Sequence, residues 1–162
     1  MNIIYARQNI VASLVSPSIF LAGPTPRDIE TKSWRPEAIA LFEKHNFNGT
    51  LLVPEDESWG VKGNYYDQIE WEEQALHKAD CILFWIPREL KTMPAFTTND
   101  EWGFWKASGK VVLGVPEEAE KCRYQIYYAN KFNVPFAVTL EDTIVNALQL
   151  VERFDLDRAK LV

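Results

Sequence analysis

Short apolar runs recur along this chain, and the segments between them carry apolar residues every three or four positions. The runs indicate strands at 18–22, 51–53, 81–86, 110–115 and 136–139. The helical spacing between them predicts helices at 32–46, 66–78, 99–107, 121–132 and 140–154. Strands without polar interruptions are typical of parallel sheets that are covered on both faces. The pattern therefore predicts an α/β protein, a three-layer Rossmann-like (flavodoxin-like) fold with a five-stranded, mainly parallel sheet and helices on both faces.

Residues 1–16 fit this alternation less clearly. Segments 2–6 and 9–15 are short and partly apolar, and we expect them to pair as a hairpin. This stretch is too short and too polar for a signal peptide, and no apolar run along the chain is long enough to span a membrane. A polar loop with Trp59 inside it is expected at 55–64. Because the chain has no repeat and no linker, residues 1–162 are expected to form a single domain.

The composition is that of a globular protein with an acidic surface. Hydrophobic residues make up 47% of the chain and charged residues 25%, with a formal net charge of -6. No run rich in Lys or Arg is present, so we expect a small-molecule partner rather than a nucleic-acid polymer. Aromatic residues make up 13%, with six Trp. This surplus indicates that some rings line a pocket or an interface.

The cysteines and histidines do not indicate a metal site. Cys81 and Cys122 are far apart in sequence, and neither they nor His45 and His77 have the spacing of metal ligands. Cys81 falls in an expected buried strand, where a free thiol behaves as a small hydrophobic group. We therefore expect a reduced, cytoplasmic protein that needs no metal and no organic cofactor.

Polar side chains gather where the expected strands end, which is where open α/β sheets bind ligands. Gly23 follows the first of these strands, and a glycine there permits either a sharp turn or the close approach of a ligand. The sequence leaves both interpretations open. No glycine-rich dinucleotide loop and no triphosphate loop is present, so these two modes of nucleotide binding are not supported.

One carboxylate stands out between the expected strands at 81–86 and 110–115. Glu101 is followed by Trp102, and an aromatic neighbour strengthens charge interactions by lowering the local dielectric constant. We expect Thr98 or Asn99 to cap a helix that has Asp100 and Glu101 in its first turn. A glutamate in that position either complements the helix dipole or serves chemistry. Both interpretations stay open at this point.

A second candidate lies in the helix predicted at 66–78. Glu72 belongs to an acidic stretch in which Glu70 and Glu73 are interpreted as a solvated face. Glu72 itself fits either that face or a position near the functional edge of the sheet.

Three segments, taken in order, resemble a known family. They are Ile19-Phe20-Leu21-Ala22-Gly23-Pro24, then 71–87 with Trp71-Glu72 and Ala79-Asp80, then 97–110 with Glu101-Trp102-Gly103. In these segments the chain resembles the nucleoside 2-deoxyribosyltransferase family, and more closely its bacterial deoxyribosyltransferase-like branch. The resemblance implies that Glu101, in the family's Glu-x-Gly element, is the nucleophile that attacks the anomeric carbon of a sugar. It also implies that Glu72 binds the sugar or transfers protons.

The resemblance and the strand ends together give the expected substrate-binding residues. These are Gly23, Pro24, Thr25, Arg27, Trp71, Thr97, Thr98, Asn99, Asp100 and Trp102. The substrate implied is a nucleoside or nucleotide, with its base stacked on Trp102, Trp105 or Phe96. Glu72 or Asp100 is expected to help the base leave. Arg27 is a candidate for binding a 5′-phosphate, whereas Arg35 is interpreted as a surface cation.

The chain departs from the family in two places. Segment 93–98 lacks the aspartate that precedes the nucleophile in the transferases, and 153–162 does not align with the element that a neighbouring subunit contributes there. Three alternatives to base transfer therefore stay open. One is hydrolysis of the N-glycosidic bond of nucleotides or of NAD, one is a non-catalytic nucleotide-binding module, and one is a flavodoxin-like protein that binds an unrelated partner.

The aromatic residues also bear on assembly. Tyr124, Tyr127 and Tyr128 lie on one predicted helix, where they mark either a homo-oligomer interface or packing of the helix on the sheet. Packing is the preferred interpretation for Tyr124 and Tyr128, and a homo-oligomer is expected.

Overall fold

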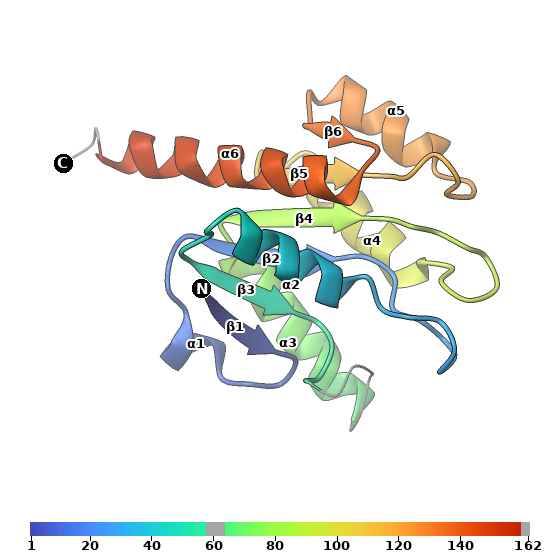
Figure 1. Cartoon of the computed structure of the whole chain (residues 1–162), viewed down its shortest axis with the longest axis horizontal. Coiled ribbons are helices and arrows are strands. Elements are labelled where there is room, and N and C mark those ends of the chain that lie inside the picture. The colour runs from blue at the N-terminus through green and yellow to red at the C-terminus, as the bar shows by residue number, and fades with distance from the viewer. Residues whose placement is uncertain (58–63, 160–162) are drawn as a thin grey trace.

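The computed structural model describes residues 1–57 and 64–159. Six strands form one sheet in the order β1-β3-β2-β4-β5-β6, and every neighbouring pair is parallel (Figure 1). The strands are β1 (Asn2–Tyr5), β2 (Ser18–Ala22), β3 (Thr50–Val53), β4 (Cys81–Trp85), β5 (Val111–Gly114) and β6 (Phe136–Ala137). The three-layer Rossmann-like fold is confirmed, with six strands in place of the expected five. The expected loop with Trp59 falls partly on 58–63, so that residue lies outside the described part.

The predicted N-terminal hairpin is wrong. Segment 2–6 supplies β1, which pairs in parallel with β3, and segment 9–15 contains the short helix α1 (Ile10–Ser13). The chain turns between them at Arg7, which has a φ of 67°, and the Asn9 side chain then caps α1 by accepting from the Ala12 N–H. Local turn chemistry thus starts a helix here, while the partner of β1 comes from a distant part of the chain.

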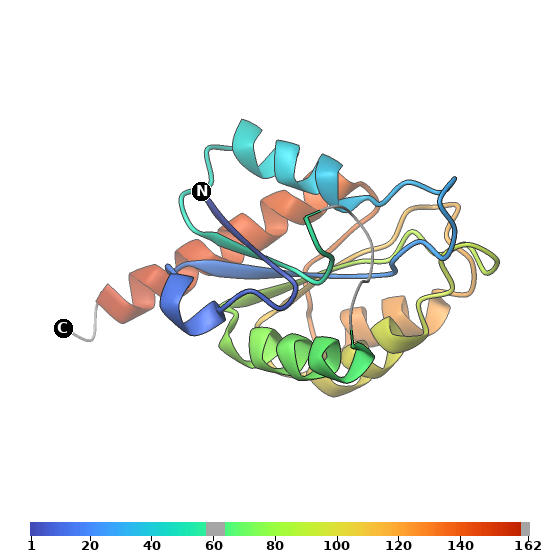
Figure 2. The same cartoon turned by 90° about the horizontal axis from the view of Figure 1, so that it is seen from below.

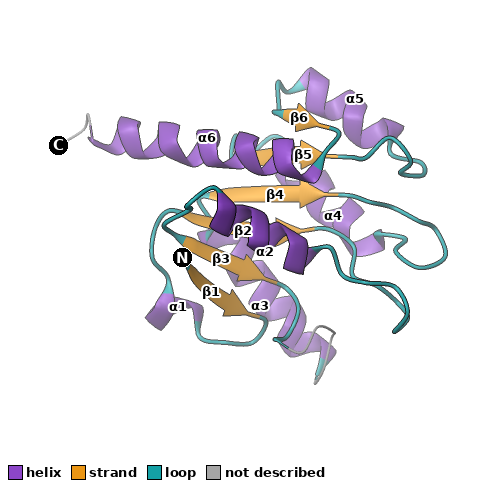
Figure 3. Cartoon of the chain, viewed as in Figure 1, coloured by secondary structure: helices purple, strands orange, loops and turns teal. Residues whose placement is uncertain are grey.

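Helices cover both faces of the sheet (Figure 2). One face carries α2 (Arg35–Lys44) and α6 (Leu140–Ala159), and the other carries α3 (Tyr65–Lys78), α4 (Phe96–Trp105) and α5 (Arg123–Lys131). The central strands β2 and β4 are buried along their whole length and contribute to an apolar core on each side. No described helix has the length and apolar character needed to cross a membrane. All strands run in the same direction, so the loops that follow them meet along one edge of the sheet (Figure 3).

Helix α3 is held firmly at both ends. The Asn64 side chain caps its start by accepting from the Tyr66 N–H at 3.0 Å. At its end, Lys110 Nζ donates to the carbonyl oxygens of Leu76, His77 and Ala79 at 2.7, 3.0 and 2.9 Å. These carbonyls lack partners within the helix, and a cation suits the negative end of the helix dipole. The side chains that α3 presents to the edge of the sheet are therefore well fixed.

Helix α4 begins earlier than the sequence suggests. Its N-cap is Ala95, in the left-handed conformation at φ 60° and ψ 43°, and the Asn99 N–H already donates to the Ala95 carbonyl. The prediction that Thr98 or Asn99 caps the helix is wrong, because the backbone at Ala95 makes the turn without a capping side chain. Glu101 consequently lies beyond the first turn, and α4 has no acidic residue in that turn. Complementation of the helix dipole therefore no longer accounts for Glu101.

Candidate functional site

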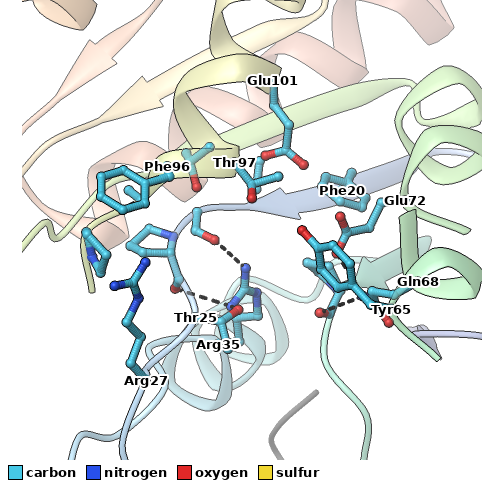
Figure 4. Close-up of a pocket in the computed structure, with 17 residues that line it drawn as sticks. Phe20, Thr25, Arg27, Arg35, Tyr65, Gln68, Glu72, Phe96, Thr97 and Glu101 are labelled. Atoms are coloured by element: carbon cyan, nitrogen blue, oxygen red, sulfur yellow. Dashed lines mark hydrogen bonds between the residues drawn. The ribbon is translucent and has the colours of Figure 1, made fainter. Parts of the chain in front are cut away.

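A cavity of about 190 Å³ lies at the carboxyl edge of the sheet (Figure 4). Its walls come from the end of β2 and the loop after it, from Pro54 after β3, from the first residue of α2, and from the first two or so turns of α3 and α4. Ligand pockets commonly hold about 300–1,000 Å³. A ligand of nucleoside size is therefore expected to extend from this cavity through its mouth, where Arg27 and Phe96 stand.

Gly23 is required where the chain leaves β2. A Cβ atom at this position would lie 2.2 Å from the carbonyl oxygen of Trp85 and 2.8 Å from the Trp34 ring. Neither of these groups can move far, because both side chains are buried in the core. The glycine therefore lets the loop pack tightly against β4, and it also lines the cavity.

The interpretation of Arg35 as a surface cation is wrong. Only 1% of this residue is exposed, and its guanidinium lies under the loop that follows β2. Nε donates to the Leu21 carbonyl, Nη2 to the Gly23 carbonyl, and Nη1 to Thr25 Oγ1, at 3.2, 2.8 and 3.2 Å. Arg35 thus holds the floor of the cavity in shape by binding backbone oxygens of the loop.

Glu55 neutralises Arg35. The two side chains are each 1% exposed, and Arg35 Nη1 lies 2.5 Å from Glu55 Oε1. Glu55 directly follows Pro54 at the end of β3, so this ion pair joins β3 to the loop after β2. Removing either partner is costly, since the other charge would be left uncompensated in an apolar interior.

Two carboxyl groups face the cavity from different helices. Glu72 projects from α3 and Glu101 from α4 (Figure 4). Burial raises the pKa of Glu101 to about 8, the charge of Glu72 adds to the rise, Asp100 adds a little more, and Arg35 opposes it. Burial also raises the pKa of Glu72, against a hydrogen bond from Gln68 and the charge of Arg35. The pair therefore retains a proton at neutral pH, and in the free protein Glu101 is the carboxyl that holds it.

The structure brings together eight of the expected site residues. These line the cavity: Gly23, Pro24, Thr25, Arg27, Glu72, Thr97, Thr98 and Glu101. Two expected binding residues are buried elsewhere: Trp71 donates to the Gln8 carbonyl at 2.9 Å, and Trp102 packs edge-on against Phe84.

Asn99 and Asp100 also lie away from the cavity wall. Asn99 Oδ1 accepts hydrogen bonds from Arg88 Nη2 and from Gln125 Nε2 at 2.5 and 2.7 Å, which ties α4 to α5. Asp100 is exposed, and it acts on the site only through its charge. The early start of α4 explains this, because it puts Thr97, Thr98 and Glu101 on the face toward the cavity.

Only one of the three rings proposed for base stacking lies at the cavity. Phe96 stands at the mouth with 64% of its surface exposed, and the Arg27 guanidinium lies 5.0 Å from the centre of its ring. Trp105 instead lines a neighbouring apolar groove between α3 and α4. Trp102 is buried in the core.

Sequence reasoning missed three polar residues of the wall, namely Arg35, Gln68 and Tyr65. Gln68 lies one helical turn before Glu72, so an i, i+4 search from Glu72 finds it. The role of Arg35 has no comparable signal, because its partner Glu55 and the carbonyls that it binds are not close in sequence. Within residues 1–57 and 64–159, no three His, Cys, Asp or Glu side chains are grouped so that they could hold a metal ion.

Comparison with known proteins identifies a family for this chain. The sequence model of a family described as nucleoside 2-deoxyribosyltransferase like matches residues 16–119. The match covers more than half of the chain and includes both Glu72 and Glu101, so the chain belongs to this family. No curated protein matches the chain.

Proposed function

We propose that this member of the nucleoside 2-deoxyribosyltransferase-like family exchanges the base of (deoxy)nucleosides through a covalent glycosyl intermediate on Glu101. Family membership supports a glycosyl-transfer-like activity. The finer proposal rests on one observation, which is that Glu72 and Glu101 reach one cavity from two helices at the carboxyl edge of the sheet. Glu101 also stands in the Glu-x-Gly element that carries the nucleophile in the resembling transferases.

The proposed reaction has two steps. Ionised Glu101 attacks C1′ of the sugar while the bond from C1′ to the base nitrogen breaks, and Glu72 gives its proton to that nitrogen. The nitrogen of a second base then attacks C1′ from the side that the first base left, its proton returns to Glu72, and Glu101 departs as a carboxylate. Two displacements retain the configuration at C1′.

The proton that the first step needs is already in the cavity. The two carboxyls share one proton at neutral pH, because burial holds the pKa of Glu101 at about 8 beside the charge of Glu72. In the free protein this proton is on Glu101, so substrate binding has to move it to Glu72 before the attack. The expected signature is a bell-shaped pH profile: the rate rises with pH as the pair loses a first proton, and it falls above about 8 as the pair loses the proton that the leaving base needs.

Phe96 and Arg27 are proposed to bind the two ends of the substrate that extend beyond the cavity. Phe96 offers an exposed ring face for the base. Arg27 is exposed and suits a 5′-phosphate. Comparing a nucleoside with its monophosphate in wild type and in Arg27→Ala tests the second role. A preference that is the same in both proteins would remove Arg27 from the site.

Hydrolysis is the second candidate, and the chain offers one observation in its favour. Where the transferases have an aspartate shortly before the nucleophile, this chain has Pro94, Ala95 and Phe96 at the cavity. A site without a carboxylate for the incoming base holds a second base less firmly. Water then competes better for the glycosyl intermediate, and a nucleotide or NAD would be cleaved without transfer.

A second copy of the chain is the proposed partner. The groove between α3 and α4 is lined by Ile69, Leu76, Phe104 and Trp105 together with both site carboxyls. Phe104 is 71% exposed there, and an apolar surface beside a reaction site is expected to be covered. On α5, Tyr124 and Tyr127 are exposed and only Tyr128 packs against the core, so core packing does not explain Tyr124. Light scattering that shows a strict monomer at micromolar concentration would contradict this assembly.

Product analysis tests the proposed reaction. The protein is incubated with deoxynucleosides, their monophosphates and NAD, with and without a second free base, and the bases and nucleosides are separated by chromatography. We expect a new nucleoside only when the second base is present, and a rate loss on the order of 10⁴-fold in Glu101→Gln. Glu70→Gln, on the exposed face of α3, is the matched control. Release of base without any acceptor would assign hydrolysis, and a normal rate in Glu101→Gln would contradict the mechanism.

A further inference from the structure

Gln68 is a buried polar residue with no role in the two reaction steps proposed above. It lies on α3 one turn before Glu72, it lines the cavity, and only 3% of it is exposed. Burying an amide is costly unless its hydrogen bonds are made inside the protein. The bonds that Gln68 makes therefore indicate what it does.

The two hydrogen bonds of the side chain fix the orientation of its amide. Nε2 donates to the Pro54 carbonyl at 3.1 Å and to Glu72 Oε1 at 2.7 Å (Figure 4). Both partners accept hydrogen bonds, so exchanging the amide nitrogen and oxygen would lose both bonds. Pro54 directly follows β3, and Gln68 thus fastens the Glu72 carboxyl to the end of that strand.

This hydrogen bond distinguishes the two carboxyls. Glu72 has a fixed donor on Oε1, which leaves Oε2 as the oxygen that can carry a proton. Glu101 has no hydrogen bond to its carboxyl from the described residues. Other charged or titratable groups also lie around the pair: the buried Arg35, which Glu55 neutralises, the exposed Asp100, Arg27 in the same cavity, and Glu73 and His77 in the groove between α3 and α4. Gln68 is therefore a neutral group that distinguishes the two carboxyls, because it donates a hydrogen bond to Glu72 and none to Glu101.

We propose that Gln68 is a positioning residue, which holds Oε1 of Glu72 so that Oε2 delivers the proton to the leaving base. A donor on a carboxylate favours its ionised form, so Gln68 also makes Glu72 a stronger acid. The delivery step rests on the proposed function, whereas the hold on Glu72 does not. In Gln68→Met, which keeps the length of the side chain and removes its donor, the pKa of Glu72 is expected to rise.

The test has one readout that does not depend on activity. The carboxyl carbons of ¹³C-glutamate-labelled full-length protein are followed by NMR across a pH series, and Glu72 is assigned by its absence in Glu72→Gln. We expect Glu72 to titrate at a higher pH in Gln68→Met, and not in Gln74→Met, which alters an exposed glutamine of the same helix. Gln68→Asn, whose shorter amide does not reach Glu72, serves if the first variant does not fold. An unchanged Glu72 titration in the folded variant would overturn the proposal.

The second readout is the pH profile of base release. Its acid limb is expected at higher pH in Gln68→Met, with kcat reduced and KM nearly unchanged, because the substrate is bound by other residues. A loss confined to KM would also overturn the positioning role. If no substrate is turned over at all, the proposed reaction fails, and the NMR titration still decides whether Gln68 controls Glu72.

Discussion

Glu101 is expected to lower the stability of the folded protein at neutral and alkaline pH. Burial in the cavity, next to the charge of Glu72, raises its pKa from the ordinary value of 4.5 to about 8. Between these two values the folded state holds a proton that the unfolded state has lost. The free energy of unfolding of wild type therefore falls as pH rises from about 4.5 to about 8, and it levels off above that range.

The size of this change in the free energy of unfolding follows from the difference between the two pKa values of Glu101. One pKa unit corresponds to about 1.4 kcal/mol, so the distance from 4.5 to about 8 gives at most about 5 kcal/mol. Glu101→Gln keeps the shape of the side chain and cannot ionise. We expect this variant to match wild type near about pH 4 and to be several kcal/mol more stable near about pH 9. Stabilisation on losing a charged group is typical of sites that are kept for function.

The assay is urea unfolding of wild type and Glu101→Gln across this pH range, followed by tryptophan fluorescence. Glu70→Gln is the control, since it removes an exposed carboxylate from α3. A difference in unfolding free energy between Glu101→Gln and wild type that stays constant with pH would refute the reasoning. It would show that Glu101 is not held in the anionic, desolvated surroundings described above.

Three further substitutions test the frame around the site. Gly23→Ala puts a Cβ atom 2.2 Å from the Trp85 carbonyl oxygen, and we expect a loss of about 1–3 kcal/mol or more in urea unfolding; unchanged stability would contradict the tight packing of the loop. Arg35→Met leaves Glu55 charged and buried, which is expected to lower the free energy of unfolding by about 3–5 kcal/mol. The double variant Arg35→Met, Glu55→Leu is expected to regain much of this loss, and strictly additive losses would contradict the pairing. Lys110→Met removes three hydrogen bonds at the end of α3 and is expected to cost about 1–3 kcal/mol; hydrogen exchange in the last turn of α3 should then quicken, and unchanged protection would contradict the cap.

The central strands could be predicted because their signal is local. β2 and β4 are buried on both faces, so every position except Ser18 is apolar and the run stands out in the sequence. β1 has only two aliphatic residues, Ile3 and Ile4, and its pairing with β3 joins segments far apart in the chain, so no local pattern predicts this pairing. Two short apolar segments that are close in sequence suggest a hairpin, and this is why the prediction for residues 2–15 is wrong.

The residues of the candidate site also fall into those that could be predicted from the sequence and those that could not. Glu101 and the loop from Gly23 could be placed at the cavity because topology alone brings strand ends together. Arg35 could not, since nothing local distinguishes a cation at a helix start that is exposed from one that lies under a loop. The start of α4 was missed because Ala95 turns the backbone with no polar side chain, while the residues after it have the composition of a cap.

The proposed mechanism requires that Glu101 becomes covalently attached to the sugar. The most direct measurement is mass spectrometry of the intact protein, followed by peptide mapping, after incubation with deoxynucleosides, their monophosphates and NAD in the absence of acceptor base. We expect an added mass equal to the sugar moiety, located on Glu101 and absent in Glu101→Gln. Base release with no adduct at any time, and with the same rate in Glu101→Gln, would contradict it.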